Sequence, residues 1–213
     1  MSCCSREISS TGRFFSRFAR RYRRRYRRKG LEPTQRQLLA GLHAAGFSGA
    51  SVLEIGAGVG YLHQTLVREG AAHALGVDLS ADMLREAEAF AAEQNISTRV
   101  AYRQGDFVAL AGDIPAADVV VLDKVVCCYP DARSLVASSL AKTQRVYALT
   151  YPRDRAFNHI GVALMRAAMW IVRSPFRNYV HDPAAIETWI TDAGFSKRYE
   201  QRSFVWLTQV FVR

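Results

Sequence analysis

The sequence predicts an α/β fold, in which a mostly parallel sheet carries helices on both faces. Val52 to Ile55 is a short apolar run with an acid set into it, as in a buried strand, and the glycine-rich turn Gly56 to Gly60 follows at once. A second apolar run, His73 to Val77, ends at Asp78. Further short apolar runs alternate with helical patterns along the chain, which is typical of parallel α/β sheets.

The remaining elements are expected in a regular order. Gly30 to Thr34 interrupts helix formation, and Thr34 can cap a new helix that runs to about Ala45. Ser80 is a second cap residue, followed by acids in the first turns of a helix. The other predicted elements are a helix from Tyr61 to Glu69, strands over Ser97 to Tyr102, Ala117 to Lys124 and Arg145 to Tyr151, helices over Ala156 to Val172 and Pro183 to Ala193, and a last, antiparallel strand over Ser203 to Val212.

Length and composition indicate one α/β domain. The chain has 213 residues, of which 49% are apolar, enough for one sizeable core. It shows neither a signal-peptide pattern nor an uncharged apolar run of about 18 residues, so we expect a cytoplasmic protein. The four cysteines form two adjacent pairs, Cys3-Cys4 and Cys127-Cys128, whereas disulfide frameworks and zinc sites space their cysteines more widely. We therefore expect thiols and no metal site.

The net charge of +10 has a local origin. Ten Lys or Arg and no acid lie between Arg13 and Lys29, which leaves nineteen basic and nineteen acidic residues elsewhere. The sequence is therefore expected to divide into a basic N-terminal arm, residues 1–33, and a nearly neutral domain, residues 34–213. The first ten residues show no strong pattern.

The arm is expected to form one basic helix from Arg13. Aromatic residues recur every four positions, at Phe14, Phe18, Tyr22 and Tyr26, and so form one stripe. The stripe can dock on the domain, which such stripes do most often; it can instead enter an anionic membrane surface beside the arginines, or stack on the bases of a nucleic acid, in decreasing order of expectation.

The glycine spacing discriminates between nucleotide cofactors. A dinucleotide fingerprint needs a third glycine at the position of Tyr61, so NAD is disfavoured. Asp78 lies about twenty residues past the glycines, where a carboxylate can accept both hydroxyls of a ribose. An adenosine-type ligand is therefore expected.

The pattern Glu54-x-Gly56-x-Gly58-x-Gly60, with Asp78, resembles the S-adenosylmethionine site of the class I methyltransferases, and the later elements follow that family's order from Leu38 to Arg213. The resemblance implies a Rossmann-like class I methyltransferase fold with a mostly parallel, seven-stranded sheet. It implies that Asp106 binds the adenine amino group beside Phe107, and that Asp123 and Lys124 face the methionine end of the cofactor. It also implies that a docked N-terminal arm closes over the cofactor and the substrate, so that Tyr22 and Tyr26 can reach the site. The full set of cofactor-binding residues implied is Glu54, Gly56, Ala57, Gly58, Gly60, Asp78, Leu79, Met83, Asp106, Phe107, Asp123 and Lys124.

The run Val125 to Pro130 narrows the resemblance. It lacks the Asn/Asp-Pro-Pro-Tyr/Phe loop of many methyltransferases that act on amino groups of bases, and is similar to the corresponding segment of magnesium-protoporphyrin O-methyltransferases. The Tyr179-Val180-His181 segment before the last helix is similar to that family as well. One departure concerns the histidine that the family carries ahead of Tyr-Pro, which is Cys128 here. A thiol replaces that histidine as a proton carrier only if its pKa is lowered.

The sequence predicts a methyltransferase that acts on a small molecule, most plausibly on an oxygen of a hydrophobic or aromatic acceptor. Its candidate catalytic residues are His181, Tyr129 and Cys128, with His159 less favoured, whereas His43, His63 and His73 are expected to lie away from the site. The helix from Ala156 is expected to cover the substrate; it can instead contact a membrane surface, while Arg166 within it argues against a span. Two alternatives stay open. One is a regulatory protein that keeps the cofactor pocket and binds RNA or a membrane through Arg13 to Lys29, and the other is a soft-metalloid or thiol acceptor held by the paired cysteines.

Overall fold

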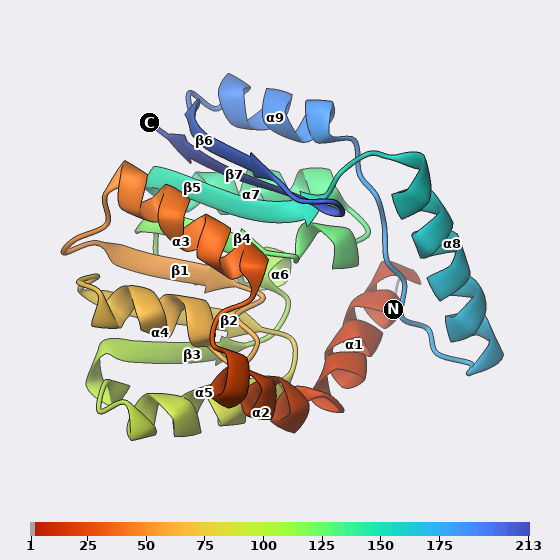
Figure 1. The fold of residues 1–213 in the computed structure, drawn as a ribbon, viewed down its shortest axis with the longest axis horizontal. Helices are drawn as coiled ribbons and strands as arrows, with labels where there is room; N and C mark the ends of the chain where they lie inside the picture. The colour runs from red at the N-terminus through yellow and green to blue at the C-terminus, as the bar shows by residue number, and fades with distance from the viewer. Residues whose placement is uncertain (1–2) are drawn as a thin grey trace.

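The computed structural model describes the backbone of residues 3–213 and the side chains of residues 8 and 10–213. Its centre is a seven-stranded sheet with the order β3-β2-β1-β4-β5-β7-β6 (Figure 1). Strands β1 to β5 are parallel, and β7 runs antiparallel to both β5 and β6. The strands are β1 (Ser51–Ile55), β2 (His73–Asp78), β3 (Val100–Gln104), β4 (Ala117–Asp123), β5 (Thr143–Pro152), β6 (Ser196–Arg202) and β7 (Trp206–Val212). The predicted α/β fold with a mostly parallel sheet is confirmed.

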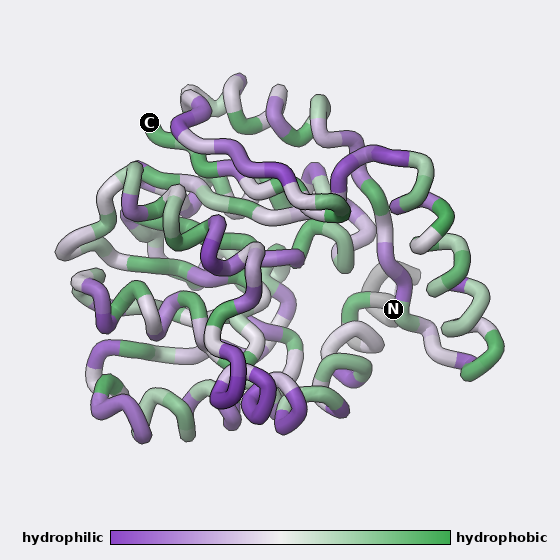
Figure 2. The backbone as a smooth tube through the Cα atoms, viewed as in Figure 1, coloured by the Kyte–Doolittle hydropathy of each residue, from purple (hydrophilic) through white to green (hydrophobic). Residues whose placement is uncertain are grey.

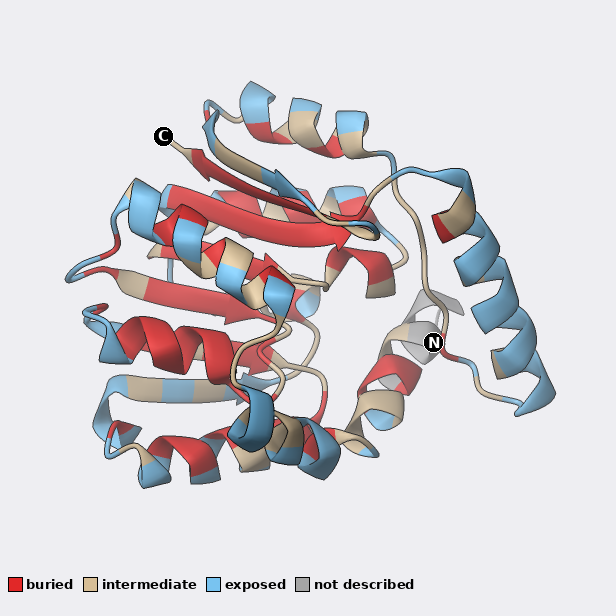
Figure 3. Cartoon of the chain, viewed as in Figure 1, coloured by how far each residue is buried: buried red, intermediate tan, exposed pale blue. Residues whose placement is uncertain are grey.

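Helices cover both faces of the sheet. Strand β4 shows why: Val119 and Val121 face one hydrophobic core, while Val120 and Leu122 face the other, because side chains alternate along a strand. Strands buried on both faces appear as the red centre of the fold in Figure 3. One core packs against α3 (Pro33–Ala45), α4 (Tyr61–Arg68) and α5 (Ala81–Glu93), and the other against α6 (Phe107–Leu110), α7 (Ala132–Ala141) and α9 (Pro183–Asp192).

The strand order reverses at β1, which pairs with β2 on one side and β4 on the other. The helix that follows β1 and the 3-10 turn η2 (Val126–Cys128) that follows β4 therefore lead away from this point on opposite sides. A crevice opens at such a switch point, beyond the carboxyl ends of the strands.

The N-terminal arm differs from its prediction. It forms two helices, α1 (Cys3–Ser16) and α2 (Ala19–Lys29), with a turn at Arg17 and Phe18 in place of one helix from Arg13. Residues 3–10, whose sequence shows no strong pattern, thus belong to α1. The turn interrupts the aromatic stripe, so its two halves pack on different parts of the molecule: Phe14 stacks on Phe176 at 4.3 Å, and Tyr26 stacks on Tyr61 at 3.8 Å between ring centroids.

Helix α2 is docked on α5 despite its charge. Arg23 forms ion pairs with Glu86, at 2.6 Å, and with Glu93. Arg27 also reaches Glu93, at 2.6 Å. Stacked rings and ion pairs therefore hold the arm, which matches the docking alternative. The exposed arginines of α2 still face solvent and give the purple region of Figure 2.

Several single elements differ from their predictions. Strand β6 was missed, because its sequence is polar at an exposed sheet edge and the period-2 apolar signal is weak. The third strand begins at Val100, since residues 97–99 form a 3-10 turn. Helix α3 is capped by Glu32 in a capping box with Gln35, not by Thr34.

Helix α8 (Ala156–Ile171) is apolar yet exposed along most of its length (Figures 2 and 3). It projects from the sheet beside α1 in Figure 1. Among the residues that the structure describes, no helix is long and apolar enough to cross a bilayer.

Candidate active site

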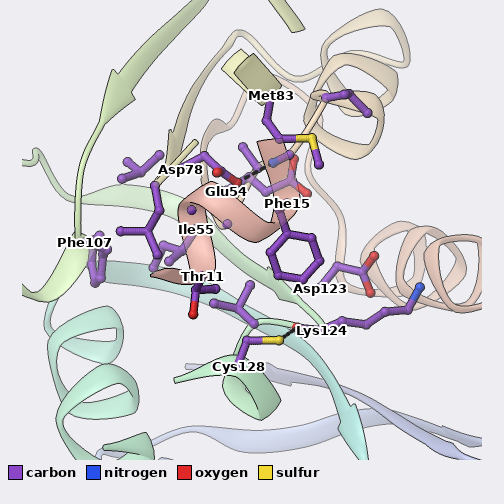
Figure 4. Close-up of a pocket in the computed structure, with 18 of the residues that line it drawn as sticks. Thr11, Phe15, Glu54, Ile55, Asp78, Met83, Phe107, Asp123, Lys124 and Cys128 are labelled. Carbon is purple, nitrogen blue, oxygen red and sulfur yellow. Dashed lines mark hydrogen bonds between the residues drawn. The ribbon is translucent and has the colours of Figure 1, made fainter. Parts of the chain in front are cut away.

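A cavity of about 380 Å³ lies at the carboxyl ends of β1, β2 and β4, at the switch point of the sheet (Figure 4). Thirteen of the fifteen residues predicted for the site line it: Glu54, Gly56, Ala57, Gly58, Asp78, Leu79, Met83, Asp106, Phe107, Asp123, Lys124, Cys128 and Tyr129. The structure therefore brings residues from positions 54 to 129 to one place, as parallel strands with a common carboxyl edge do.

The glycine turn after β1 forms one wall. Gly56 has a φ of 68°, a left-handed value that favours glycine, and a Cβ there would lie 2.4 Å from Val125 Cγ2. The amides of Gly56 and Ala57 both donate to the carbonyl of Val77, at 2.7 and 3.0 Å, and so fix the turn to the end of β2. The main chain is thus bare and rigid where it faces the cavity.

Asp78 is tied to the same turn. Its Oδ2 accepts from the Gly58 amide and its Oδ1 from the Ser80 amide, both at 2.8 Å. Burial raises the pKa of Asp78 against the opposing effect of these two bonds. Each carboxylate oxygen keeps a second acceptor site, so the side chain can still receive two hydroxyl donors from the cavity.

Glu54 is 3% exposed and has a partner that the sequence did not predict. Its Oε2 accepts from Nδ1 of His63 at 2.6 Å and from the His63 amide at 3.1 Å. His63 does not line the cavity, as expected, but the first turn of α4 brings it back over β1 and into contact with Glu54. Tyr102 completes the network, with its hydroxyl 3.3 Å from His63 Nε2.

Asp123, at the end of β4, differs from Glu54. The residue is half-buried, but its Oδ1 is shielded from solvent and receives no hydrogen bond from any side chain or amide in the described part of the chain. Burial raises the pKa of Asp123 to about 6; Lys124 and a hydrogen bond from Gln35 act in the opposite direction. A buried carboxylate oxygen without a donor, beside a cavity, fits a cationic ligand group.

Lys124 turns the chain away from β4 with a φ of 61°, an uncommon value for a lysine. Its ammonium group pairs with Glu32, which also pairs with Arg25 at 3.2 Å, and it lies 5.5 Å from the ring centroid of Trp206. The sequence did not single out Arg25, Glu32 or Trp206, because they come from the arm, from the cap of α3 and from β7. Together they form the polar mouth of the cavity.

Tyr22 lines the same mouth. Burial, followed by the charge of Glu32, raises the pKa of its phenol, so the hydroxyl stays protonated and can donate a hydrogen bond at neutral pH. Tyr26, which was also predicted to reach the site, instead stacks on Tyr61 and does not line the cavity.

Asp106 and Phe107 follow β3 on the opposite wall. Asp106 Oδ1 accepts from the Val108 amide at 3.1 Å and caps α6. The Tyr129 hydroxyl donates to the same carboxyl group, at 3.1 and 3.2 Å from its two oxygens. Tyr129 and Asp106 are therefore one hydrogen-bonded unit, and Phe107 lies beside it as a buried ring.

Cys127 and Cys128 sit in the turn η2, with their Sγ atoms 3.7 Å apart, and both line the cavity. A hydrogen bond with Cys128, followed by burial, raises the pKa of the Cys127 thiol. Cys3 and Cys4 lie outside the residues with described side chains, so the predicted four-cysteine arrangement has no structural description. Within the described side chains, no group of three or more His, Cys, Asp and Glu is placed to hold a metal ion.

The cavity is covered by α1 of the N-terminal arm, and the resemblance implied a cover of this kind. Gly12 approaches the main chain so closely that a Cβ would lie 2.9 Å from the Leu79 oxygen. The hydroxyls of Ser16 and Ser80 are 2.7 Å apart. Thr11 and Phe15 face the cavity from α1 (Figure 4). Helix α8, which was predicted to cover the substrate, contributes no residue to the lining.

Two predicted site residues lie outside the lining. Gly60 has a left-handed φ of 78° at the start of α4, and a Cβ there would lie 2.6 Å from Gln64 Nε2, so it serves helix packing. His181 Nε2 lies 3.0 Å from the backbone oxygen of Tyr129. Burial lowers the pKa of His181, so the ring is neutral at pH 7 and donates to that carbonyl. In this position His181 supports the wall from behind. His159 is exposed and pairs with Asp154.

The cavity fits an adenosine-type cofactor that carries an amino acid. A bare glycine turn with Asp78 can take a ribose, the Asp106 and Phe107 wall can take a base, and the unpartnered oxygen of Asp123 can take an ammonium group. These three places lie at the ends of four neighbouring strands, β3, β2, β1 and β4. The volume is within the range of small-molecule sites.

Comparison with known proteins agrees with this geometry. Residues 52–146 match the family of methyltransferase domains. No curated protein matches the chain. The magnesium protoporphyrin IX methyltransferase from Synechocystis, solved with bound SAH and with bound SAM, is similar at TM-scores of 0.71 and 0.70 and identities of 22% and 21%, over 96% of this chain and 99% and 97% of that one. An O-methyltransferase family 2 protein from Planctomyces limnophilus, in complex with apigenin, is similar at a TM-score of 0.63 and 15% identity, over 86% of this chain and 62% of that one. At these identities the solved structures show a common fold.

Proposed function

We propose that this chain, whose residues 52–146 match a methyltransferase domain, is a class I, S-adenosylmethionine-dependent methyltransferase that methylates an oxygen of a small hydrophobic or aromatic acceptor. The observation that carries the proposal is the convergence of Asp78, Asp106 and Asp123 with the glycine turn around one cavity. The fold hosts many acceptors, so the choice of acceptor is argued from the mouth of the cavity.

The cofactor-binding roles follow from the contacts. Asp78 is proposed to hold the ribose, and the glycine turn from Gly56 to Gly58 is proposed to let the ribose and the amino-acid chain approach the main chain closely. Asp106 is proposed to hold the adenine amino group, with Phe107 against the base. When bound, S-adenosylmethionine supplies an activated methyl group on a sulfonium. Asp123 is proposed to receive the ammonium group of its methionine portion, which satisfies the carboxylate oxygen that otherwise has no donor.

The acceptor is proposed to bind at the mouth, between Tyr22, Cys128 and Trp206. The rings of Tyr22 and Trp206 and the thiol of Cys128 add apolar surface beside the charged groups of the mouth, which suits an aromatic acceptor. Tyr22, with its raised pKa, donates a hydrogen bond to the acceptor oxygen, and the Lys124 ammonium favours an oxygen that carries negative charge. An acceptor carboxylate or phenolate is then positioned without removal of a further proton by the protein.

Two measurements test this proposal. Calorimetry with S-adenosylmethionine and S-adenosylhomocysteine should show binding to both, while NAD serves as a negative control because Tyr61 stands where the third glycine would be. Transfer of labelled methyl to a cell extract should then yield a small product. Release of labelled methanol by mild base identifies a carboxyl ester, while an ether resists it. Binding without transfer to any fraction would reject the enzyme in favour of a regulatory protein.

The paired thiols favour a second candidate acceptor. Cys127 and Cys128 place two sulfur atoms 3.7 Å apart on the cavity wall, about the spacing of two thiolates bound to one thiophilic ion at 2.3 Å each. Arsenite added to the methyl-transfer assay tests this candidate. Formation of a methylated arsenical by the wild type, and its loss in the Cys127→Ser/Cys128→Ser variant, would support it.

The partner predicted for the arm stays a proposal. Arg20, Arg21 and Arg24 are exposed in α2 and can face an anionic membrane or RNA. The rings that were expected to enter the headgroup layer are instead used in packing, as the stacking of Tyr26 on Tyr61 shows. Any contact by the arm therefore rests on charge alone and should weaken steeply with salt.

A further inference from the structure

Helix α8 exposes most of the large apolar side chains that face solvent. Ile160, Leu164, Trp170 and Ile171 are 60%, 67%, 76% and 73% exposed. The helix is green in Figure 2 and almost entirely pale blue in Figure 3, so the same residues are both apolar and exposed. Contiguous exposed apolar surface of this kind marks an interaction site.

The orientation of α8 is the reverse of that of a core-facing helix. Ile160, Leu164 and Ile171 are spaced by four and seven residues, so they lie along one line of the helix surface, and all three are exposed. The side facing the domain is held by Asn158, which is buried and donates to the carbonyls of Arg153 and Val205 at 2.7 and 3.1 Å. The apolar line therefore points away from the protein.

The charge around α8 is mostly positive, although Asp154 precedes the helix and pairs with His159. From Arg155 to Val180 the sequence contains four arginines and no acid. Arg155 and Arg173 flank the helix at its two ends and are exposed. Arg166 lies on the helix, where its guanidinium donates to the Asn178 carbonyl at 3.1 Å and covers the Tyr179 ring at 5.3 Å. None of these four arginines is paired with a carboxylate in the part of the chain that the structure describes.

We propose that α8 is a membrane-surface helix, which lies in the interface of an anionic lipid bilayer with its apolar line toward the acyl chains. A helix of 16 residues is about 24 Å long, shorter than the ~30 Å hydrocarbon core, and Arg166 lies within it, so it lies along the surface and does not span. The flanking arginines reach the anionic headgroups, and Trp170 sits at the depth that indole rings prefer.

A lipid surface fits these residues better than a protein partner. The exposed apolar side chains extend beyond the line to Met165 and Val172, which are 42% and 65% exposed on another side of the helix. A groove that accepts a helix contacts a narrower stripe, whereas the headgroup boundary receives a wide one. The excess of arginines around the helix, four against the single Asp154, also complements an extended anionic surface.

The segment that follows α8 leads directly to the cavity. Phe176 stacks on Phe14 of the covering helix α1, and the Tyr179 amide donates to the Cys127 carbonyl at 2.8 Å. A bilayer bound to α8 would therefore hold an element that is joined directly to the segment supporting the cover and wall of the cavity. A hydrophobic acceptor dissolved in the lipid would enter from that side, and this last step rests on the proposed function.

Flotation with lipid vesicles tests the membrane contact. The full chain should float with vesicles of phosphatidylcholine mixed with phosphatidylglycerol, and about tenfold less with phosphatidylcholine alone. The Leu164→Asp/Ile171→Asp variant should lower the partition coefficient by about a hundredfold or more, because two apolar side chains that would enter the lipid are lost from the helix. Both positions are exposed, so circular dichroism should show an unchanged fold.

Matched variants separate α8 from the arm. The first variant, Arg20→Gln/Arg21→Gln/Arg24→Gln, removes three exposed charges from α2 and should keep the blue shift of Trp170 fluorescence on anionic vesicles. The second variant, Trp170→Phe, should lose that shift and still float with the vesicles. Three results would overturn the proposal: no flotation of the wild type, equal flotation of Leu164→Asp/Ile171→Asp, or a vesicle-free dimer that this variant makes monomeric. None of these results depends on methyl transfer.

Discussion

Two carboxylates that line the cavity from neighbouring strands have different roles, one in the stability of the fold and one in the binding site. Glu54, on β1, has an oxygen that accepts two hydrogen bonds from His63. Asp123, at the end of β4, has an oxygen that receives none among the described residues. Both line the same cavity, and both were assigned to the cofactor from the sequence.

The difference indicates which of the two carboxylates is available to bind a ligand. A buried polar atom that is already satisfied stabilises the fold, and its removal leaves its partner unpaired. A buried atom without a partner costs free energy until a ligand supplies the donor. We therefore expect changes at Glu54 to act on stability and changes at Asp123 to act on cofactor affinity.

The largest expected effect is that of Glu54→Ala on stability. Removing the carboxylate leaves His63 buried with an unpaired ring nitrogen and amide, which should lower the free energy of unfolding by about 3–5 kcal/mol. Glu54→Gln is the matched control. Its amide oxygen can still accept from His63, so the loss should be about 1–2 kcal/mol. Urea unfolding monitored by circular dichroism measures both. Equal losses in the two variants would mean that charge, not hydrogen bonding, holds His63.

Asp123→Asn should give the opposite result. The amide is nearly isosteric and carries no charge, so affinity for S-adenosylmethionine should fall by about 30- to 100-fold, as for the loss of a charged hydrogen bond. Stability should stay the same or rise, because a buried charge is removed. Calorimetric titration and urea unfolding on the same sample test both statements. Unchanged affinity together with lower stability would assign Asp123 a structural role like that of Glu54.

The same carboxylate predicts a pH dependence. Its pKa in the folded protein is about 6, above the ordinary value of 3.8, so the folded state binds the proton more tightly than the unfolded state. Stability should therefore fall by about 1–3 kcal/mol as pH rises from 4 to 6 and level off above 6, relative to Asp123→Asn. Cofactor affinity should change in the other direction, decreasing as pH falls below about 6, because the ammonium group needs the ionised form. A cofactor affinity that is flat from pH 5 to 8 would contradict this role.

The comparison also explains what the sequence could predict. The positions of Gly56, Asp78 and Asp123 follow from local rules, since each ends a strand or turn that the apolar pattern identifies. The partner of Glu54 could be expected only from helix geometry, because His63 lies nine residues along the chain and meets Glu54 through the first turn of α4. The mouth of the cavity was least predictable, because Arg25, Glu32 and Trp206 are brought together from three distant segments.

Peripheral elements were the other source of error. Helix α8 was expected to cover the substrate because apolar residues are usually buried, but it contributes no residue to the cavity, which is covered by α1 of the arm. Gly12 allows α1 to approach Leu79 at a distance that no Cβ permits. A single glycine within a helix carries no sequence signal of what it will contact, so this close contact was found only in the structure.

Substitution of His181 should have the smallest effect on stability and rate. It tests whether a satisfied side chain outside the cavity is structural, as Glu54 is expected to be. The ring donates to the Tyr129 carbonyl at 3.0 Å from outside the cavity, so its polar group is satisfied within the protein, as that of Glu54 is. His181→Ala should cost about 1 kcal/mol of stability and lower kcat by less than about tenfold, whereas loss of a general base lowers kcat by about 10²- to 10⁴-fold. The pKa of His181 is lowered from its ordinary value of 6.5. The pH–rate profiles of the wild type and of His181→Ala should therefore have the same shape near pH 6.5. Steady-state rates from pH 5 to 8, with His159→Asn as the control for an exposed histidine, decide the point. A loss of a hundredfold or more would make His181 catalytic and would show that the wall of the cavity opens toward it during turnover.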